Sequence, residues 1–167
     1  MKTLILALIL FSQYAHAHPG MPAPVMPKEF EPLKGLVGTW EGTAKMGDKD
    51  EAVTVVYELT SAGSALTERL MPGTPNEMIS VYHKEGKSVG MTHYCALGNQ
   101  PHMKLKKTDG KVLVFTMTGS QGLTSTSEPH MHAVTLTIDG NTLTQEWTHY
   151  EKGKKSSTAV FKFKKKS

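Results

Sequence analysis

From position 36 onward, short runs of alternating apolar and polar residues follow one another along the chain. The runs are rich in Thr, Val, Tyr, Leu and Met, and turn-forming residues separate them. The interruptions fall at positions 47–48, 62–64, 72–76, 85–87, 98–101, 109–110, 139–141 and 152–153. Because each run is short and ends at residues such as Gly, Asn, Asp or Pro, the pattern predicts about ten strands.

The connections between these runs favour antiparallel neighbours. Asp109-Gly110 and Asp139-Gly140 are typical of two-residue hairpin turns, because Gly accepts the positive φ that such turns require. No long amphipathic helix separates the runs, which disfavours a parallel sheet. Many strands with short connections form two sheets or close into a barrel, and closure removes the exposed edges. We therefore predict an all-β fold, an antiparallel meander that closes into a barrel.

The first residues have the order of a signal peptide. Lys2 precedes an apolar run at positions 4–11, and Ala15-His16-Ala17 forms a small-residue cleavage site. The run is too short to cross a bilayer, which takes about 20 apolar residues, and no second run of that kind follows. We expect residues 1–17 to be removed and the protein to be periplasmic or secreted.

Residues 18–32 hold five prolines and predict an extended leader without a fold of its own. Phe30, Leu33, Leu36 and Val37 then recur at helical spacing. We expect a short helical turn that leads into one barrel domain at residues 33–167.

Composition narrows the function classes. Cys95 is the single cysteine, so the sequence predicts no internal disulfide and no lipidated cysteine after the signal peptide. The net charge of +4 is weighted toward Lys162, Lys164 and the lysines that follow, which we interpret as a solvated strand face that guards an edge. The sequence has no basic patch with interleaved aromatic residues, so it gives no indication of nucleic-acid binding.

One strand has no clean apolar side. Across positions 142–150, one face carries Leu143, Gln145, Trp147 and His149, and the other carries Thr144, Glu146, Thr148 and Tyr150. A half-polar inner face suits a barrel that holds a ligand better than a tightly packed core, because buried polar groups need partners.

Residues 33–42 enter the first strand through Gly38-Thr39-Trp40, and this opening resembles that of lipocalin and nitrobindin-like members of the calycin superfamily. Residues 93–101, 131–133 and 143–147 are similar to segments of small exported bacterial proteins of this lipocalin-like kind. The resemblance implies a lipocalin-like barrel and no particular activity. It also implies that Trp40 closes one end beneath a cation from the last strand, which would be Lys162 or Lys164, or would be missing from this chain.

Our leading hypothesis is a non-enzymatic binding protein for a small, partly apolar ligand. The polar contacts would come from Glu68, His93, Asn99, Gln100, His132 and Glu146, and the aromatic lining from Tyr94 and Trp147.

A second hypothesis is a metal or haem site. The spacing of His130 and His132 places two imidazoles on one face of a strand, and His93 or Glu146 would supply a third ligand. His18, as the mature N-terminus, would offer an amine and an imidazole to copper.

Two further alternatives stay open. Cys95 is either a small buried apolar residue or a thiolate activated by His93, two residues away. The domain could also be an interaction module that uses a sheet edge or the basic tail, which predicts an exposed apolar patch.

Overall fold

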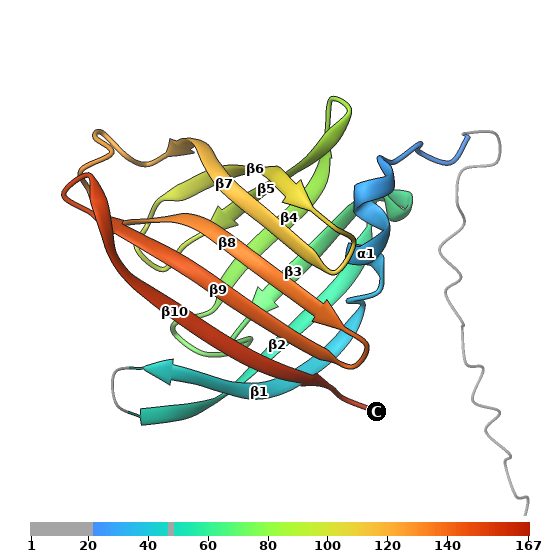
Figure 1. Ribbon diagram of the computed structural model, residues 1–167, viewed down its shortest axis with the longest axis horizontal. Helices are drawn as coiled ribbons and strands as arrows, with labels where there is room; N and C mark the ends of the chain where they lie inside the picture. The colour runs from blue at the N-terminus through green and yellow to red at the C-terminus, as the bar shows by residue number, and fades with distance from the viewer. Residues whose placement is uncertain (1–21, 47–48) are drawn as a thin grey trace, which may run out of the picture.

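The computed structural model describes residues 22–46 and 49–167, and these form a closed barrel of ten antiparallel strands (Figure 1). Each strand pairs with the next in sequence, and the last strand pairs with the first. The predicted meander barrel, with its short N-terminal helical turn, is confirmed. The signal-peptide prediction and the beginning of the leader lie outside the described residues.

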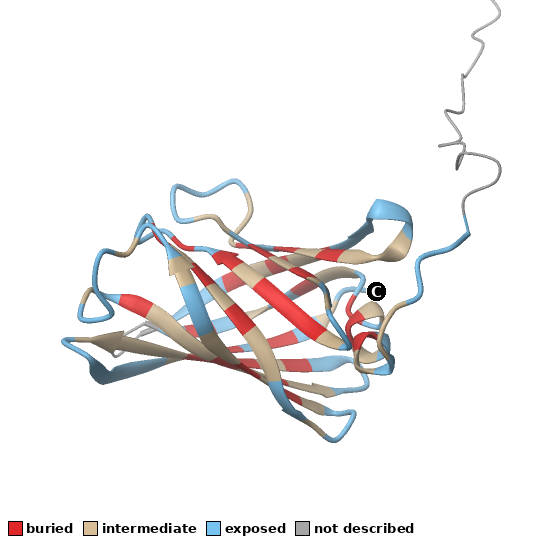
Figure 2. Ribbon diagram, turned by 90° about the horizontal axis from the view of Figure 1, so that it is seen from above, coloured by how far each residue is buried: buried red, intermediate tan, exposed pale blue. Residues whose placement is uncertain are grey.

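The strands are β1 (Gly38–Met46), β2 (Lys49–Thr60), β3 (Ala65–Leu70), β4 (Met78–Glu85), β5 (Ser88–Tyr94), β6 (Gln100–Thr108), β7 (Val112–Gln121), β8 (His130–Asp139), β9 (Thr142–Glu151) and β10 (Lys154–Lys165). A 3-10 turn, η2 (Ser61–Gly63), joins β2 to β3. Buried and exposed residues alternate along the strands, as expected when one face of a closed sheet forms the core (Figure 2).

A helical turn covers one end of the barrel. It consists of η1 (Lys28–Phe30) and α1 (Glu31–Lys34), and it buries Phe30 and Leu33 completely. Removing such side chains from water stabilises the fold by about 1.5–3 kcal/mol each. The turn begins at Lys28, five residues before residue 33, where the proline pattern had placed the start of the domain. The apolar spacing that starts at Phe30 outweighs the local proline content.

Trp40 lies beside this helical turn, and its indole Nε1 donates to the carbonyl oxygen of Leu36 at 2.7 Å. The cation over its ring is Lys165, whose Nζ lies 5.4 Å from the ring centroid. Lys162 and Lys164 are exposed on the outer face, so assigning the cation to either was wrong. Lys165 is the direct cross-strand partner of Trp40, which brings its side chain back toward the barrel end.

Most connections between strands fall where the turn chemistry predicts them. Gly110 and Gly140 both have positive φ, as the hairpin signals require. Gly47-Asp48 lies outside the described residues. The connection at positions 122–129, between β7 and β8, was missed, although Gly122 and Pro129 bracket a polar segment there.

Barrel closure depends on a close approach between β1 and β10. A Cβ atom on Gly42 would lie 1.8 Å from the backbone oxygen of Lys162, so only glycine fits at this position. Because β10 pairs with both β1 and β9, it is not an edge strand. The exposed lysines of β10 therefore do not guard an edge, as the charge pattern had suggested.

Candidate functional site

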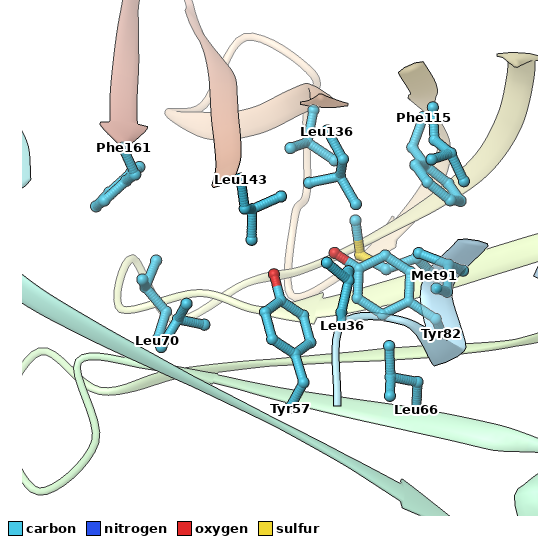
Figure 3. Packing of buried hydrophobic residues seen from close by; sticks show 14 of the residues in the cluster. Leu36, Tyr57, Leu66, Leu70, Tyr82, Met91, Phe115, Leu136, Leu143 and Phe161 are labelled. Atoms are coloured by element: carbon cyan, nitrogen blue, oxygen red, sulfur yellow. The ribbon is translucent and has the colours of Figure 1, made fainter. Parts of the chain in front are cut away.

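Glu68 lies inside the barrel, where it is fully buried and surrounded by hydrogen-bond donors. The hydroxyls of Tyr57 and Tyr82 donate to its Oε2 at 2.8 and 2.9 Å. Figure 3 shows both hydroxyls directed into the barrel interior. The Gln145 amide donates to the same oxygen at 3.3 Å, and Ser80 donates to Oε1 at 3.3 Å. Each carboxylate oxygen therefore accepts from a neutral donor.

Strand register explains why these residues meet. Tyr57 is the direct cross-strand partner of Glu68, Glu68 is the partner of Ser80, and Ser80 is the partner of His93. Directly opposed residues lie on the same face of a sheet. Four consecutive strands thus place one polar row across the inner wall of the barrel.

Burial sets the ionisation of this row. Desolvation raises the pKa of Glu68, although its hydrogen bonds act in the opposite direction. Desolvation, followed by the nearby Glu68 charge, raises the pKa of Tyr57 and Tyr82 well above the ordinary value. Both phenols therefore stay protonated and serve as donors.

His93 ends the polar row and is 1% exposed. Its Nδ1 lies 3.0 Å from the Ser80 hydroxyl, and its ring lies 4.4 Å from the Trp147 ring. Nε2, on the other side of the ring, is buried and has no hydrogen-bond partner among the described residues. Burial lowers the pKa of His93 to about 4, so the ring is neutral at neutral pH.

The tautomer of His93 is coupled to the ionisation of Glu68. When Glu68 is ionised, Ser80 donates its one hydroxyl proton to Glu68 and accepts from the Nδ1–H of His93, which leaves a lone pair on Nε2.

A cavity of about 120 Å³ lies beside His93. Its buried walls are Leu70, His93, Trp147 and Phe161, and its half-buried rim is formed by Met71, Met78, Met131 and Ala159. Two of its lining residues, Met71 and Met78, flank the β3–β4 connection. That connection lies at the barrel end opposite α1 (Figure 1). Among the described residues that line the cavity, His93 is the one titratable residue, and its Nε2 is buried without a hydrogen-bond partner.

A second chain of hydrogen bonds joins the cavity to the Glu68 row. Trp147 Nε1 donates to Gln145 Oε1 at 2.9 Å, and the Gln145 amide donates to the Tyr57 hydroxyl at 2.6 Å. The two aromatic walls, His93 and Trp147, are therefore both held by the same buried network. Locked wall residues of this kind keep a binding site in one geometry.

The structure brings together Glu68, His93 and Trp147 of the predicted ligand-binding residues. Tyr94 and Glu146 do not belong to the site, because Tyr94 is 52% exposed and Glu146 is exposed. Each follows or precedes an inward residue in a strand, and neighbours in a strand face opposite sides. Predicting both members of each pair as pocket residues was wrong.

Asn99 and Gln100 hold loops together and do not line the cavity. Asn99 is buried, and its Nδ2 donates to the carbonyl oxygen of Pro129 at 2.9 Å. Gln100 donates to the carbonyl oxygen of Gly98 at 3.3 Å. Their prediction as ligand contacts was wrong, since the β5–β6 connection packs against the β7–β8 connection.

His130 and His132 do share a face, with Nε2 of the first 3.3 Å from Nδ1 of the second. His132 also stacks on Tyr150, with ring centroids 3.9 Å apart. Tyr150 is three residues from Trp147 in β9, so this pair lies on the face opposite the cavity. Burial and the nearby His130 lower the pKa of His132.

The predicted metal set of His93, His130 and His132 is wrong. Across residues 22–46 and 49–167, no group of three or more His, Cys, Asp or Glu side chains lies close enough to hold a metal ion. A β-bulge between Met131 and Ala133 breaks the alternation of β8. The thioether of Met131 lines the cavity instead.

Cys95 is buried, in keeping with the interpretation as a small apolar residue. Burial raises the pKa of its thiol. His93, the proposed activating base, has its Nδ1 bound to Ser80 instead. The structure therefore does not support an activated thiolate.

Several site residues were missed by the sequence analysis. They are Tyr57, Ser80, Tyr82 and Gln145 in the polar network, and Met71, Met78 and Met131 at the cavity rim. Gln145 could have been found, because it stands two residues before Trp147 on the same face of the strand.

Comparison with known proteins adds no family assignment: no family model and no curated protein gives a significant match to the chain. Within the part of the chain that the structure describes, no helix has the length and apolar character needed to cross a membrane. The function is therefore argued from the cavity and its polar network.

Proposed function

We propose that this protein is an exported binding protein that holds a small ligand in the cavity at the open end of its barrel. The observation that carries this proposal is the buried Nε2 of His93, which has no partner and belongs to a wall residue of an otherwise apolar cavity. Buried polar atoms are almost always paired, and an unpaired one needs an explanation. A ligand that donates a hydrogen bond to Nε2 would explain why this atom has no partner within the protein.

The cavity limits the size of the bound group. Its volume of about 120 Å³ is below the range of about 300–1,000 Å³ that pockets for larger organic ligands occupy. A cavity of about 150 Å³ binds benzene. The ligand, or the part of it that enters, is therefore a group of a few non-hydrogen atoms, and a haem does not fit.

A binding role is favoured over catalysis. General acid–base or nucleophilic catalysis requires reactive groups within reach of a bound substrate. His93 is the one titratable wall residue, and its partners Ser80 and Glu68 are directed away from the cavity wall into the network. The network therefore orients one hydrogen-bond acceptor, Nε2 of His93. It assigns no second reactive group of the cavity wall to catalysis.

Export is part of the proposal and rests on the signal-peptide pattern of residues 1–17. Cell fractionation followed by mass measurement of the purified chain tests it. We expect a mature chain that begins at or near His18 outside the cytoplasm. A full-length chain in the cytoplasmic fraction would contradict export and leave the cavity proposal in place.

Binding is tested with two five-membered rings that differ in one donor. Pyrrole carries an N–H that can reach Nε2, whereas furan has the same shape and no donor. We expect both to shift the NMR signals of the cavity residues, with pyrrole about 3- to 10-fold tighter, the value of one hydrogen bond.

A cavity-filling variant provides the control. Ala159→Leu places a larger side chain in the rim of the cavity and should abolish binding of both rings. Ala52→Leu makes the same change at an exposed position of β2 and should retain it. Equal binding to both variants, or no saturable binding to the unmodified chain, would refute the proposed function.

A further inference from the structure

We propose that His130 and His132 form a pH-sensitive latch, which holds the β7–β8 connection (positions 122–129) against the barrel at neutral pH and releases it when both rings are protonated. This inference goes beyond the proposed function, because it concerns a conformational change and needs no bound ligand. Met131 stands between the two histidines and lines the cavity, so the same release would also loosen part of the cavity rim.

The β7–β8 connection begins where the two strands have already separated. The ladder between β7 and β8 ends at the pair of Thr116 and Ala133. Positions 117–121 of β7 and 130–132 of β8 are all described by the structure, and they do not pair with each other. The connection therefore depends on individual hydrogen bonds rather than on a continuous ladder.

The end of this connection is held by hydrogen bonds from other segments. The backbone N–H of Lys152 donates to the carbonyl oxygen of Ser127 at 2.7 Å. Nδ1 of His130 donates to the carbonyl oxygen of Glu128 at 2.7 Å, and the Asn99 amide holds the residue that follows. Among the described residues, His130 is the titratable side chain that takes part in these bonds.

The two imidazoles accept one proton without losing their contact. A carbonyl oxygen only accepts, so Nδ1 of His130 carries a hydrogen. Nε2 of the same ring lies 3.3 Å from Nδ1 of His132, and one hydrogen is shared between these nitrogens. When one proton is added, either ring can carry the charge and the shared hydrogen remains. A second proton places N–H against N–H, so the contact breaks.

The surroundings of the pair do not offset a second charge. His130 is fully covered, and His132 stacks on Tyr150 of β9. His149, also of β9, hydrogen-bonds to a hydroxyl of β10, and Glu128 turns its carboxylate back into its own connection. Among the described residues, no carboxylate forms an ion pair with either ring. Burial, followed by the nearby His130, lowers the pKa of His132.

The direction of the pH response follows from counting protons. An imidazole in water has a pKa of about 6.5, so below that pH the released form binds a proton on each ring. The closed form keeps one of these protons out. Because the released form binds more protons, acid favours release. At one pH unit below 6.5, one excluded proton shifts the equilibrium toward release by about 10-fold.

The test is amide hydrogen exchange of the full chain, followed by NMR at pH 7.5 and pH 5.5. The Lys152 amide is bonded to the connection, so its protection factor reports release. We expect this factor to be about 10-fold lower at pH 5.5. The amide of Val134, which lies in the paired part of β8, should stay more protected at both pH values, since it exchanges when the whole barrel opens.

A double variant removes the latch and keeps its contacts. In H130Q/H132F, glutamine retains an N–H for the Glu128 carbonyl, and phenylalanine retains a ring on Tyr150. Its Lys152 protection factor should be the same at both pH values. His102→Gln removes an imidazole of β6 that contacts Glu85 instead, and it should keep the 10-fold change.

A second measurement needs no variant and covers the case in which the double variant does not fold. A ¹⁵N NMR titration of the unmodified chain follows the ring nitrogens directly. We expect Nδ1 of His130 to carry a hydrogen at pH 7.5. We also expect the pair to take up two protons in separate steps, the second of which coincides with the loss of Lys152 protection.

Three results would overturn the latch. They are a Lys152 protection factor that does not change with pH, an equal change in the double variant, and uptake of both protons in one step near pH 6.5. None of these measurements contains a ligand. Failure of the latch therefore leaves the proposed binding function in place, and failure of pyrrole and furan to bind leaves the latch in place.

Discussion

Acidification should destabilise this protein through His93 in a defined pH window. The imidazole is buried against Trp147, and burial lowers its pKa from 6.5 to about 4. At pH values between these two pKa values, His93 binds a proton in the unfolded chain and stays neutral in the folded chain. The contribution of His93 is therefore fully present above pH 6.5 and is lost as the pH falls toward 4.

The size of the effect follows from the shift. A difference of one pKa unit corresponds to about 1.4 kcal/mol, so the change from 6.5 to about 4 amounts to about 3 kcal/mol in full. At pH 5 the same linkage relation gives a loss of about 2 kcal/mol. This is a large part of the stability of an ordinary domain, which is about 5–15 kcal/mol.

The assay is urea unfolding followed by tryptophan fluorescence at pH 7 and pH 5. His93→Gln removes the titrating ring and keeps a polar group beside Ser80. We expect the variant to lose about 2 kcal/mol less than the unmodified chain between the two pH values. Met91→Leu changes the buried core without a titrating group and should show the full loss.

Two results would refute the reasoning. Equal losses in the unmodified chain and in His93→Gln would show that this ring does not control the acid response. An NMR titration of the His93 ring with a midpoint near 6.5 would show that the ring is hydrated, which contradicts its burial.

Three other changes test the polar network, the closed end and the seam of the barrel. Glu68→Gln should reduce the loss of stability that the unmodified chain shows as the pH rises above about 4.3. The raised pKa of Glu68 keeps its carboxyl protonated in the folded chain at pH values where the unfolded chain ionises. Urea titrations across that range check this, and parallel pH curves for the variant and the unmodified chain would contradict it. Lys165→Met should cost about 0.5–2 kcal/mol by removing the cation over Trp40, whereas Lys164→Met on the exposed face should be nearly neutral in the same assay. Gly42→Ala should cost about 3 kcal/mol or more, measured by thermal unfolding, because its Cβ would overlap the backbone of β10.

Local chemistry was enough to predict the fold. Period-two alternation and closely spaced turn residues specify strands, and short connections between strands specify antiparallel neighbours. Positions such as Asp109-Gly110 carry their turn geometry within two residues. Among the connections that lie in the described residues, only the one at positions 122–129 was not predicted, because its turn residues are spread over a longer segment.

The site was harder to predict, because alternation states that two faces exist and does not say which is inside. Glu146 and Trp147 are neighbours, and burial of Trp147 in the core excluded Glu146. The bulge in β8 also changed which side chains of that strand point inward. As a result Met131 lines the cavity, where the imidazoles of β8 were expected. Neither event has a local sequence signal.

The sequence by itself therefore determined the class of element, the order of the strands and the residues capable of chemistry. The tertiary structure decided which of those residues meet, since a row such as Tyr57, Glu68, Ser80 and His93 exists only through the register of four strands. Register depends on packing between segments distant in sequence. A shift of one residue in any of these four strands would turn that strand's member of the row outward and break the row.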